Sequence, residues 1–80
     1  MEIMITKNAE KSLKRLDVAT RNRIIKAIKN LPYGDIKRLQ GLKDEVYRLR
    51  VGNYRIIYMI RGNTAFINEV LPRGSVYKRI

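Results

Sequence analysis

The segment Tyr47–Tyr58 constrains the fold most, because it predicts a β-hairpin with a defined register. Two runs that mix apolar, aromatic and arginine residues in alternation flank the pair Gly52-Asn53. Both residues tolerate the positive φ angles that a two-residue hairpin turn requires. With the turn at this pair, Val51 lies opposite Tyr54, and the flanking residues pair in order away from the turn.

The predicted hairpin has two different faces, because successive side chains of a strand point to opposite sides. The apolar face is expected to join the core and carries Tyr47, Leu49, Val51, Tyr54, Ile56 and Tyr58. The other, called the arginine face below, carries Arg48, Arg50 and Arg55, with Arg50 opposite Arg55. Like charges that face each other across a sheet destabilise it by a few tenths of a kcal/mol. A site for a polyanion would account for this cost; alternatively, the arginine stems only cover apolar sheet surface.

Net charge is the most informative feature of the composition. Eighteen Lys and Arg against seven Asp and Glu give +11 over 80 residues. Such a charge attracts nucleic acid or an acidic protein partner. A membrane surface is a less suitable partner, because the basic residues do not gather on one long amphipathic helix.

The residue types that are missing from the sequence exclude several chemistries. Without histidine or cysteine, zinc hydrolase sites, Ser-His-Asp triads and disulfides are excluded in their usual forms. A glycine-rich nucleotide loop is also missing, so we expect neither a metal nor a cofactor. The longest apolar run, Ile56–Ile60, is too short to cross a bilayer, and the N-terminus lacks a signal-peptide core. A cytoplasmic location is therefore expected.

The N-terminal half predicts one strand followed by two helices. Glu2–Ile5 is expected to form the strand. The first helix should bury Ala9, Leu13 and Leu16, and the second should bury Ile24, Ile25, Ile28 and Leu31. Thr6 or Asn8 is expected to cap the first helix, Asp17 or Thr20 the second, and Pro32 and Gly34 end it. The short link between the helices predicts an antiparallel helical hairpin.

Residues 35–45 follow no clear period and predict an irregular connection, in which Leu39 and Leu42 turn under the sheet. A third long strand is expected at 64–71, ended by Pro72.

The turn before that strand has two possible registers. A two-residue turn at Gly62-Asn63 would place Glu69 on the core side. A three-residue turn that includes Arg61 would place it on the arginine face, opposite Arg55. We expect the three-residue turn, because a lone carboxylate in a core is costly.

These elements predict a single α+β domain over residues 1–80. The N-terminal strand and the helical hairpin pack on one face of a small, mainly antiparallel sheet, and the arginine face stays at least partly open. Such a face suits single-stranded nucleic acid, since guanidinium groups bind phosphates and aromatic rings stack on bases.

The hairpin Tyr47–Tyr58 closely resembles the signature hairpin of the RelE/ParE toxins of type II toxin–antitoxin systems. The resemblance runs nearly end to end, from a leading strand through two basic helices and a Leu-x-Gly-Leu link to a short tail. In that tail, Arg73-Gly-Ser-Val-Tyr77 resembles the Arg-x-x-x-Tyr ending of RelE-type endoribonucleases, which cut mRNA in the ribosomal A site. Gyrase-poisoning ParE members share much of the hairpin, so the tail is what favours the RelE branch.

The resemblance implies metal-independent cleavage, in which the RNA 2′-hydroxyl attacks the adjacent phosphate and leaves a 2′,3′-cyclic phosphate or its hydrolysed form. It implies catalytic roles for Arg55, Arg73, Tyr77 and Arg50, and RNA binding by Arg48, Arg50, Lys43 and Lys78. Arg55 and Arg73 would clamp the phosphate, while Tyr77 would stack on a base or assist proton transfer, or else simply pack the tail.

The general base is left open, because an arginine never loses its proton in a protein. The candidates are Tyr77, Glu69, Asp35 and Glu45, or no base at all if the ribosome aligns the RNA. The implied partners are the ribosome, mRNA and a small, partly disordered antitoxin with an acidic segment. The alternatives are a ParE-type gyrase inhibitor without nuclease activity and a non-catalytic basic RNA-binding module.

Overall fold

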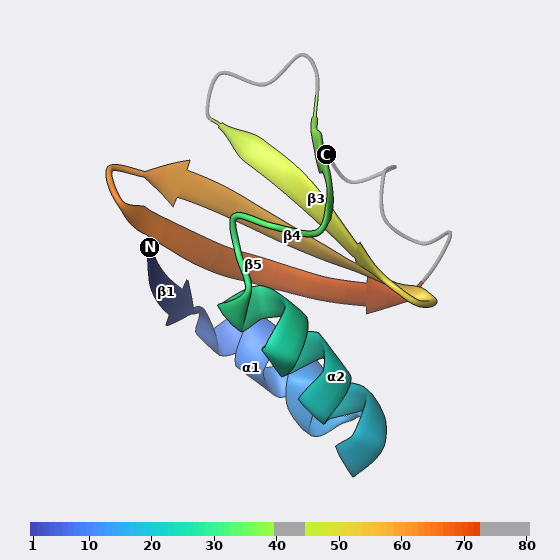
Figure 1. Cartoon of the computed structure of the whole chain (residues 1–80). Helices are drawn as coiled ribbons and strands as arrows, with labels where there is room; N and C mark the ends of the chain where they lie inside the picture. The colour runs from blue at the N-terminus through green and yellow to red at the C-terminus, as the bar shows by residue number, and fades with distance from the viewer. Residues whose placement is uncertain (40–44, 73–80) are drawn as a thin grey trace.

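The chain folds into a five-stranded sheet with two helices on one side of it (Figure 1). The structure is a computed structural model that describes residues 1–39 and 45–72. Its elements are β1 (Glu2–Ile5), α1 (Lys7–Lys14), α2 (Val18–Lys29), β2 (Asp35–Arg38), β3 (Val46–Val51), β4 (Tyr54–Arg61) and β5 (Thr64–Pro72). The strand order is β1-β5-β4-β3-β2, and only the β1–β5 pair is parallel among these neighbours. The predicted α+β fold is confirmed.

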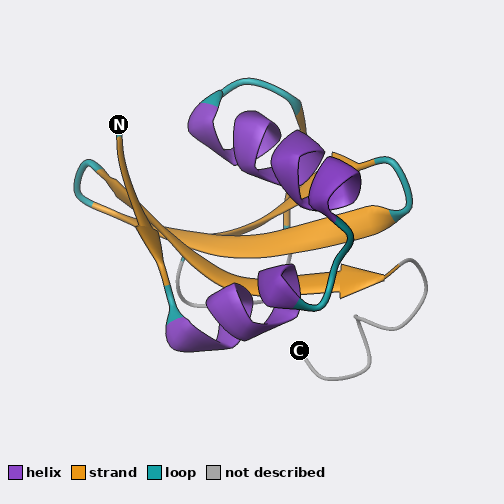
Figure 2. Ribbon diagram, turned by 90° about the horizontal axis from the view of Figure 1, so that it is seen from below, coloured by secondary structure: helices purple, strands orange, loops and turns teal. Residues whose placement is uncertain are grey.

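Both helices begin at capping residues that were among the predicted alternatives. The Thr6 hydroxyl oxygen accepts a hydrogen bond from the Ala9 backbone N–H at 3.3 Å and begins α1. The Asp17 carboxylate accepts one from the Thr20 backbone N–H at 3.1 Å and begins α2. Hydrogen bonds from Thr20 hold the pKa of the Asp17 carboxyl below its usual value. Figure 2 shows that the two helices run in roughly opposite directions.

The core lies between the helices and the predicted apolar face of the hairpin. Its buried residues are Ala9, Leu13, Ile24, Ile28, Leu31, Leu49, Ile56, Tyr58, Ala65, Ile67 and Val70. The rings of Tyr47 and Tyr58 stack within it, with centroids 5.4 Å apart and planes inclined by 18°. Leu16 and Ile25, which were predicted to be buried, are only partly so.

The turn between β4 and β5 differs from the expected one. Arg61 pairs with Thr64, so the turn contains only Gly62 and Asn63 and the prediction of a three-residue turn is wrong. Gly62 has a φ of +59°, which a two-residue hairpin turn of this kind requires and which glycine adopts without steric cost.

A β-bulge at Asn68 nevertheless places Glu69 on the arginine face. Tyr58 pairs with Ile67, but the preceding residue Ile57 pairs with Glu69, so Asn68 is an extra residue on β5. One extra residue reverses the face of every side chain that follows it. The carboxylate therefore avoids the core for a different reason from the one that the sequence suggested.

The bulge is held by the residues at the start of α1. The Thr6 hydroxyl donates a hydrogen bond to the Ile67 carbonyl at 2.9 Å. The Asn8 side-chain amide donates to the Asn68 carbonyl at 3.0 Å. Two backbone carbonyls at the irregular part of β5 thus have partners outside the sheet.

Residues 35–45 were predicted to be irregular, and this is wrong for the first four of them. Asp35–Arg38 form β2, an antiparallel edge strand whose register pairs Asp35 with Arg50 and Lys37 with Arg48. The strand contains one apolar residue, which is too few for alternation to reveal it. Leu39 is half-buried, as expected, while Leu42 lies outside the described residues. Within the described ranges, no helix is long and apolar enough to cross a membrane.

Candidate nucleic-acid interface

The three arginines of the hairpin leave the sheet on the same face. Every pair of β3 with β4 follows the predicted register, including Arg50 with Arg55 and Arg48 with Ile57. The buried residues of α1 and α2 belong to the core on the opposite face. The arginine face is therefore not covered by either helix.

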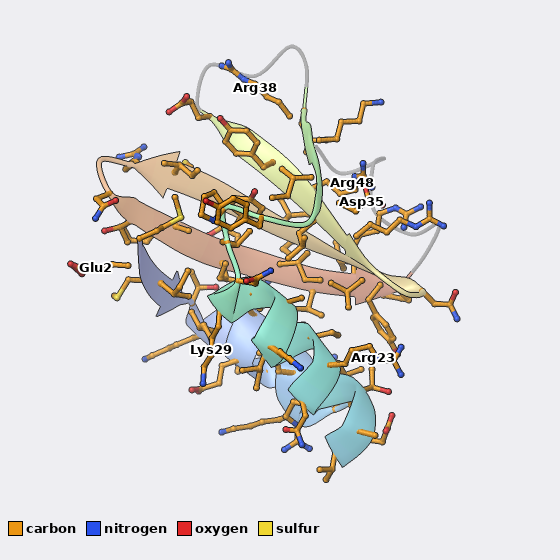
Figure 3. All side chains as sticks on the ribbon, viewed as in Figure 1. Glu2, Arg23, Lys29, Asp35, Arg38 and Arg48 are labelled. Atoms are coloured by element: carbon orange, nitrogen blue, oxygen red, sulfur yellow. The ribbon has the colours of Figure 1, made fainter. Side chains whose placement is uncertain are left out.

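Arg48 is the arginine that best fits the stem-covering alternative. Its side chain is only 13% exposed, and its cross-strand neighbour Ile57 is 4% exposed although it lies on the arginine face. The Arg48 Nη2 atom lies 3.9 Å from the Asp35 Oδ1 atom (Figure 3). A largely buried side chain opposite an apolar residue fits this alternative, and the Asp35 carboxylate supplies a counter-charge.

Arg50 and Arg55 have different surroundings from Arg48. Arg50 is exposed to solvent, and Arg55 is half-buried. The Nη1 atom of Arg55 is buried, and no described residue accepts a hydrogen bond from it. A buried donor without an acceptor costs about 1–3 kcal/mol. A phosphate oxygen is an acceptor that would remove this cost and neutralise part of the charge.

The carboxylates named as candidate bases lie in three different settings. Glu69 is half-buried on the arginine face, and it pairs with Ile57 in the same cross-strand row as Arg48. Asp35 lies at the edge of this face beside Arg48. Glu45 is exposed before β3, where it accepts a hydrogen bond from the Tyr47 hydroxyl at 3.4 Å. Of the three, Glu69 is the carboxylate that the strand register places within this face and that forms no ion pair with another described residue.

The buried tyrosine of the hairpin is not a candidate base. Burial, and to a smaller extent the neighbouring Tyr47, raises the pKa of Tyr58 to about 12. The Tyr58 phenol stays protonated at neutral pH and belongs to the core on the other side of the sheet.

Four of the predicted site residues lie outside the described part of the chain. These are Lys43, Arg73, Tyr77 and Lys78. Their roles stay predictions. Within residues 1–39 and 45–72, no group of three or more Asp, Glu, His or Cys side chains lies close enough to hold a metal ion.

Lys37 is a cation on the arginine face that sequence reasoning missed. Lys37 is exposed on β2, and it pairs with Arg48. The only signal for it was the alternation within Asp35–Arg38, which becomes meaningful once the strand is known.

Comparisons with known proteins extend over nearly the entire chain. A family described as "ParE toxin of type II toxin-antitoxin system, parDE" matches residues 3–77. Toxin RelE3 of Methanocaldococcus jannaschii is 34% identical over an alignment that covers 96% of each chain.

Solved structures with the same fold include two archaeal toxin–antitoxin complexes. The RelE–RelB complex of Pyrococcus horikoshii contains a chain with a TM-score of 0.78 and 29% identity, covering 94% of this chain and 97% of that one. The RelB–RelE complex of Methanococcus jannaschii gives 0.77 and 34%, covering 96% and 98%. The RelBE2 complex of Mycobacterium tuberculosis, at 0.75 and 22% with 90% and 96% covered, shows likeness of fold alone.

Proposed function

The chain belongs to the RelE/ParE superfamily of type II toxin–antitoxin toxins, and from this membership we propose that it is an endoribonuclease that cleaves mRNA in the ribosomal A site. The observation that supports the proposal best is the arginine face. It combines an exposed guanidinium at Arg50 with a buried, unpartnered donor at Arg55 among the described residues. A reacting phosphodiester supplies both the charge and the acceptor atoms that these groups need.

The proposed reaction is a transesterification within the RNA. The 2′-oxygen forms a bond to the adjacent phosphorus while the bond from phosphorus to the 5′-oxygen of the next nucleotide breaks. The 2′-hydroxyl proton leaves, the 5′-oxygen gains a proton, and a 2′,3′-cyclic phosphate remains. Negative charge concentrates on the non-bridging phosphate oxygens in the transition state, where Arg55 donates its hydrogen bonds. Arg50 binds the neighbouring backbone, and Arg73 is proposed to complete the clamp.

The proton transfers are assigned to groups other than arginine. Glu69 is the described carboxylate best placed to accept the 2′-hydroxyl proton, because it lies on the same face as Arg55 and forms no ion pair with another described residue. Tyr77 is proposed to stack on a base or to protonate the leaving oxygen. Asp35 is the weaker candidate, since its carboxylate already forms an ion pair with the Arg48 guanidinium.

The test is the mapping of mRNA 5′ ends after the protein is added to translating ribosomes. The wild-type chain should produce cuts at A-site codons, and Arg55→Ala should lower the rate of cutting by about 100–1,000-fold while ribosome binding persists. Arg23→Ala, which removes an exposed arginine from α2 on the helix side (Figure 3), is the matched control. Uncut mRNA with wild-type protein bound to ribosomes would contradict the proposal.

One observation favours a second candidate, the gyrase inhibitor of ParE type. The family that matches residues 3–77 carries the ParE description. On this hypothesis, cleaved DNA–gyrase complexes accumulate in the presence of the wild-type chain and ribosome-bound mRNA stays intact. A single preparation assayed in both systems separates the two functions.

The partner in either case is proposed to be a small antitoxin, since the archaeal relatives were solved as toxin–antitoxin complexes. An acidic segment of the antitoxin would cover the arginine face and replace the phosphates as counter-charge. Association should weaken steeply with added salt, because the toxin carries a net charge of +11.

A further inference from the structure

A cavity of about 320 Å³ lies on the arginine face, at some distance from the arginine pair. It is lined by Met59, Arg61, Phe66 and Asn68. Met59 occupies the same face as Arg55, because it lies four positions after Arg55 on β4 and side chains on one face recur at every second position. Phe66 pairs with Met59 across the ladder and therefore lies on that face too.

The lining combines an aromatic ring with an amide, the combination that proteins use to bind unstacked RNA bases. Phe66 and Asn68 are both half-buried, so each presents part of its side chain to the cavity. Aromatic rings stack on the faces of bases, and polar groups bind their edges. Met4, which is 55% exposed and pairs with Phe66 from β1, extends the apolar surface beside the ring.

The Asn68 side chain is available for such a contact. Its backbone carbonyl accepts the hydrogen bond from Asn8, whereas its side-chain amide makes no hydrogen bond to another described residue. Asn68 is the extra residue of the β-bulge, and bulges redirect side chains beside functional sites. An asparagine amide offers a donor and an acceptor side by side, which pair bidentately with N6 and N7 of adenine.

The distance along β4 assigns the cavity to a nucleotide other than the one at the cut. Met59 lies four residue steps from Arg55 along an extended strand, or about 13 Å. A base in the cavity therefore belongs to a nucleotide upstream or downstream of the phosphate that Arg55 contacts.

We propose that this cavity binds a single RNA base, with Phe66 stacking on it and Asn68 selecting adenine, and that it sets the sequence preference of the toxin. The proposal rests on the proposed endoribonuclease function. It goes further because it names the residues that select a base and the base that they select.

The experiment measures binding of short single-stranded RNAs that differ at one position, and maps cuts on ribosome-bound mRNA with the same variants. The wild-type chain should prefer adenine over cytosine at that position by on the order of tenfold. Asn68→Asp removes the donor, and a carboxylate accepts from the cytosine amino group, so the preference should move toward cytosine. Phe66→Ala should weaken binding of all four RNAs similarly.

Asn22→Asp on α2 is the matched control, because it makes the same chemical change at an exposed position on the helix side. Asn68→Asp retains the backbone carbonyl that accepts from Asn8, and thermal unfolding of each variant confirms that it is folded. Wild-type cutting with a base preference that Asn68→Asp leaves unchanged would overturn the inference while the endoribonuclease stands.

The binding measurements test the inference independently of the cutting assay. If the wild-type chain binds the four RNAs equally, the base pocket is overturned whatever the cutting assay gives. If it discriminates among them but never cuts, the endoribonuclease fails and the base pocket stands. If an antitoxin peptide occupies the cavity and RNA does not compete with it, the cavity is a protein-docking site and the inference is wrong.

Discussion

Arg50 and Arg55 lie directly opposite each other in the β3–β4 ladder, and neither forms an ion pair with another described residue. Two guanidinium groups on neighbouring strands repel each other, so this pairing lowers the stability of the sheet. The same two charges produce a positive potential where a phosphate is proposed to bind.

The first prediction concerns catalysis by Arg55. Replacing it with alanine should lower the rate of mRNA cutting by about 100–1,000-fold, the typical cost of one preorganised donor to a transition-state oxyanion. Arg55→Lys keeps the charge but loses the planar fork of donors, so it should recover only part of the rate. Single-turnover cutting on programmed ribosomes measures both effects. Equal rates for Arg55→Ala and wild type would remove Arg55 from the mechanism.

The second prediction concerns the cost of the arginine pair. Arg50→Thr removes the repulsion by Arg55 and the attraction to Asp35, its other cross-strand neighbour, so it should change the free energy of unfolding by no more than a few tenths of a kcal/mol. It should also reduce the dependence of RNA affinity on salt, with a logarithmic slope smaller by about 0.7 for the lost phosphate contact. Arg38→Thr on β2 is the control, since Arg38 pairs with Tyr47 and not with a like charge. Urea unfolding and binding titrations at several salt concentrations test both parts.

The third prediction concerns the contact between α1 and β5. Thr6 both caps α1 and donates to the Ile67 carbonyl, so Thr6→Ala should lower the free energy of unfolding by about 1–2 kcal/mol. Thr6→Ser keeps the hydroxyl and should retain most of the stability. A loss as large for serine as for alanine would show that the methyl group, and not the two hydrogen bonds, carries the effect. Urea denaturation measures it.

The fourth prediction concerns the bulge. Deleting Asn68 removes the extra residue, so Glu69 then follows Ile67 directly and still lies opposite Ile57 on the arginine face. The core should therefore stay unchanged, and the deletion should cost only the hydrogen bond that the Asn8 amide donates to the Asn68 carbonyl, about 1 kcal/mol. Urea denaturation measures the loss. A loss of about 3 kcal/mol or more would contradict the prediction, because it would indicate that the register has shifted and has buried the Glu69 carboxylate.

The fifth prediction is a pH dependence of stability. The pKa of Tyr58 is about 12 in the folded chain against an ordinary value of 10.0, so the folded state retains the proton over a range in which the unfolded state loses it. The stabilisation is fully present below about pH 10, and it is lost as pH rises toward 12, by roughly 2–3 kcal/mol in total. Tyr58→Phe should lack this loss. The unfolding free energy of wild type minus that of Tyr58→Phe, followed from pH 8 to 11.5, should decrease as the pH rises.

Much of the candidate site was predictable because it is local. The turn at Gly52-Asn53 and the alternation on each side of it determine which hairpin residues face each other, and all five predicted pairs are present. The assignment of arginines to one face and of Leu49, Ile56 and Tyr58 to the core follows from the same period of two. The helix caps at Thr6 and Asp17 were likewise among those predicted from the sequence, since a cap depends on residues three positions apart.

Contacts between distant parts of the chain decided the rest. The bulge at Asn68 depends on hydrogen bonds from Thr6 and Asn8, about sixty residues earlier in the chain. No local sequence pattern in β5 predicts it. The edge strand Asp35–Arg38 exists because β3 offers it backbone partners.

By itself, then, the sequence determined which residues share the arginine face, because strand alternation and turn chemistry act over a few neighbouring residues. Tertiary structure alone decided how far each of them is exposed to solvent: Arg48 is largely buried opposite Ile57, Arg50 is exposed, and Arg55 keeps a buried donor without a described acceptor. It also decided that Glu69 joins them. Burial and register depend on which strands and helices pack together, and that packing is a property of the folded chain as a unit.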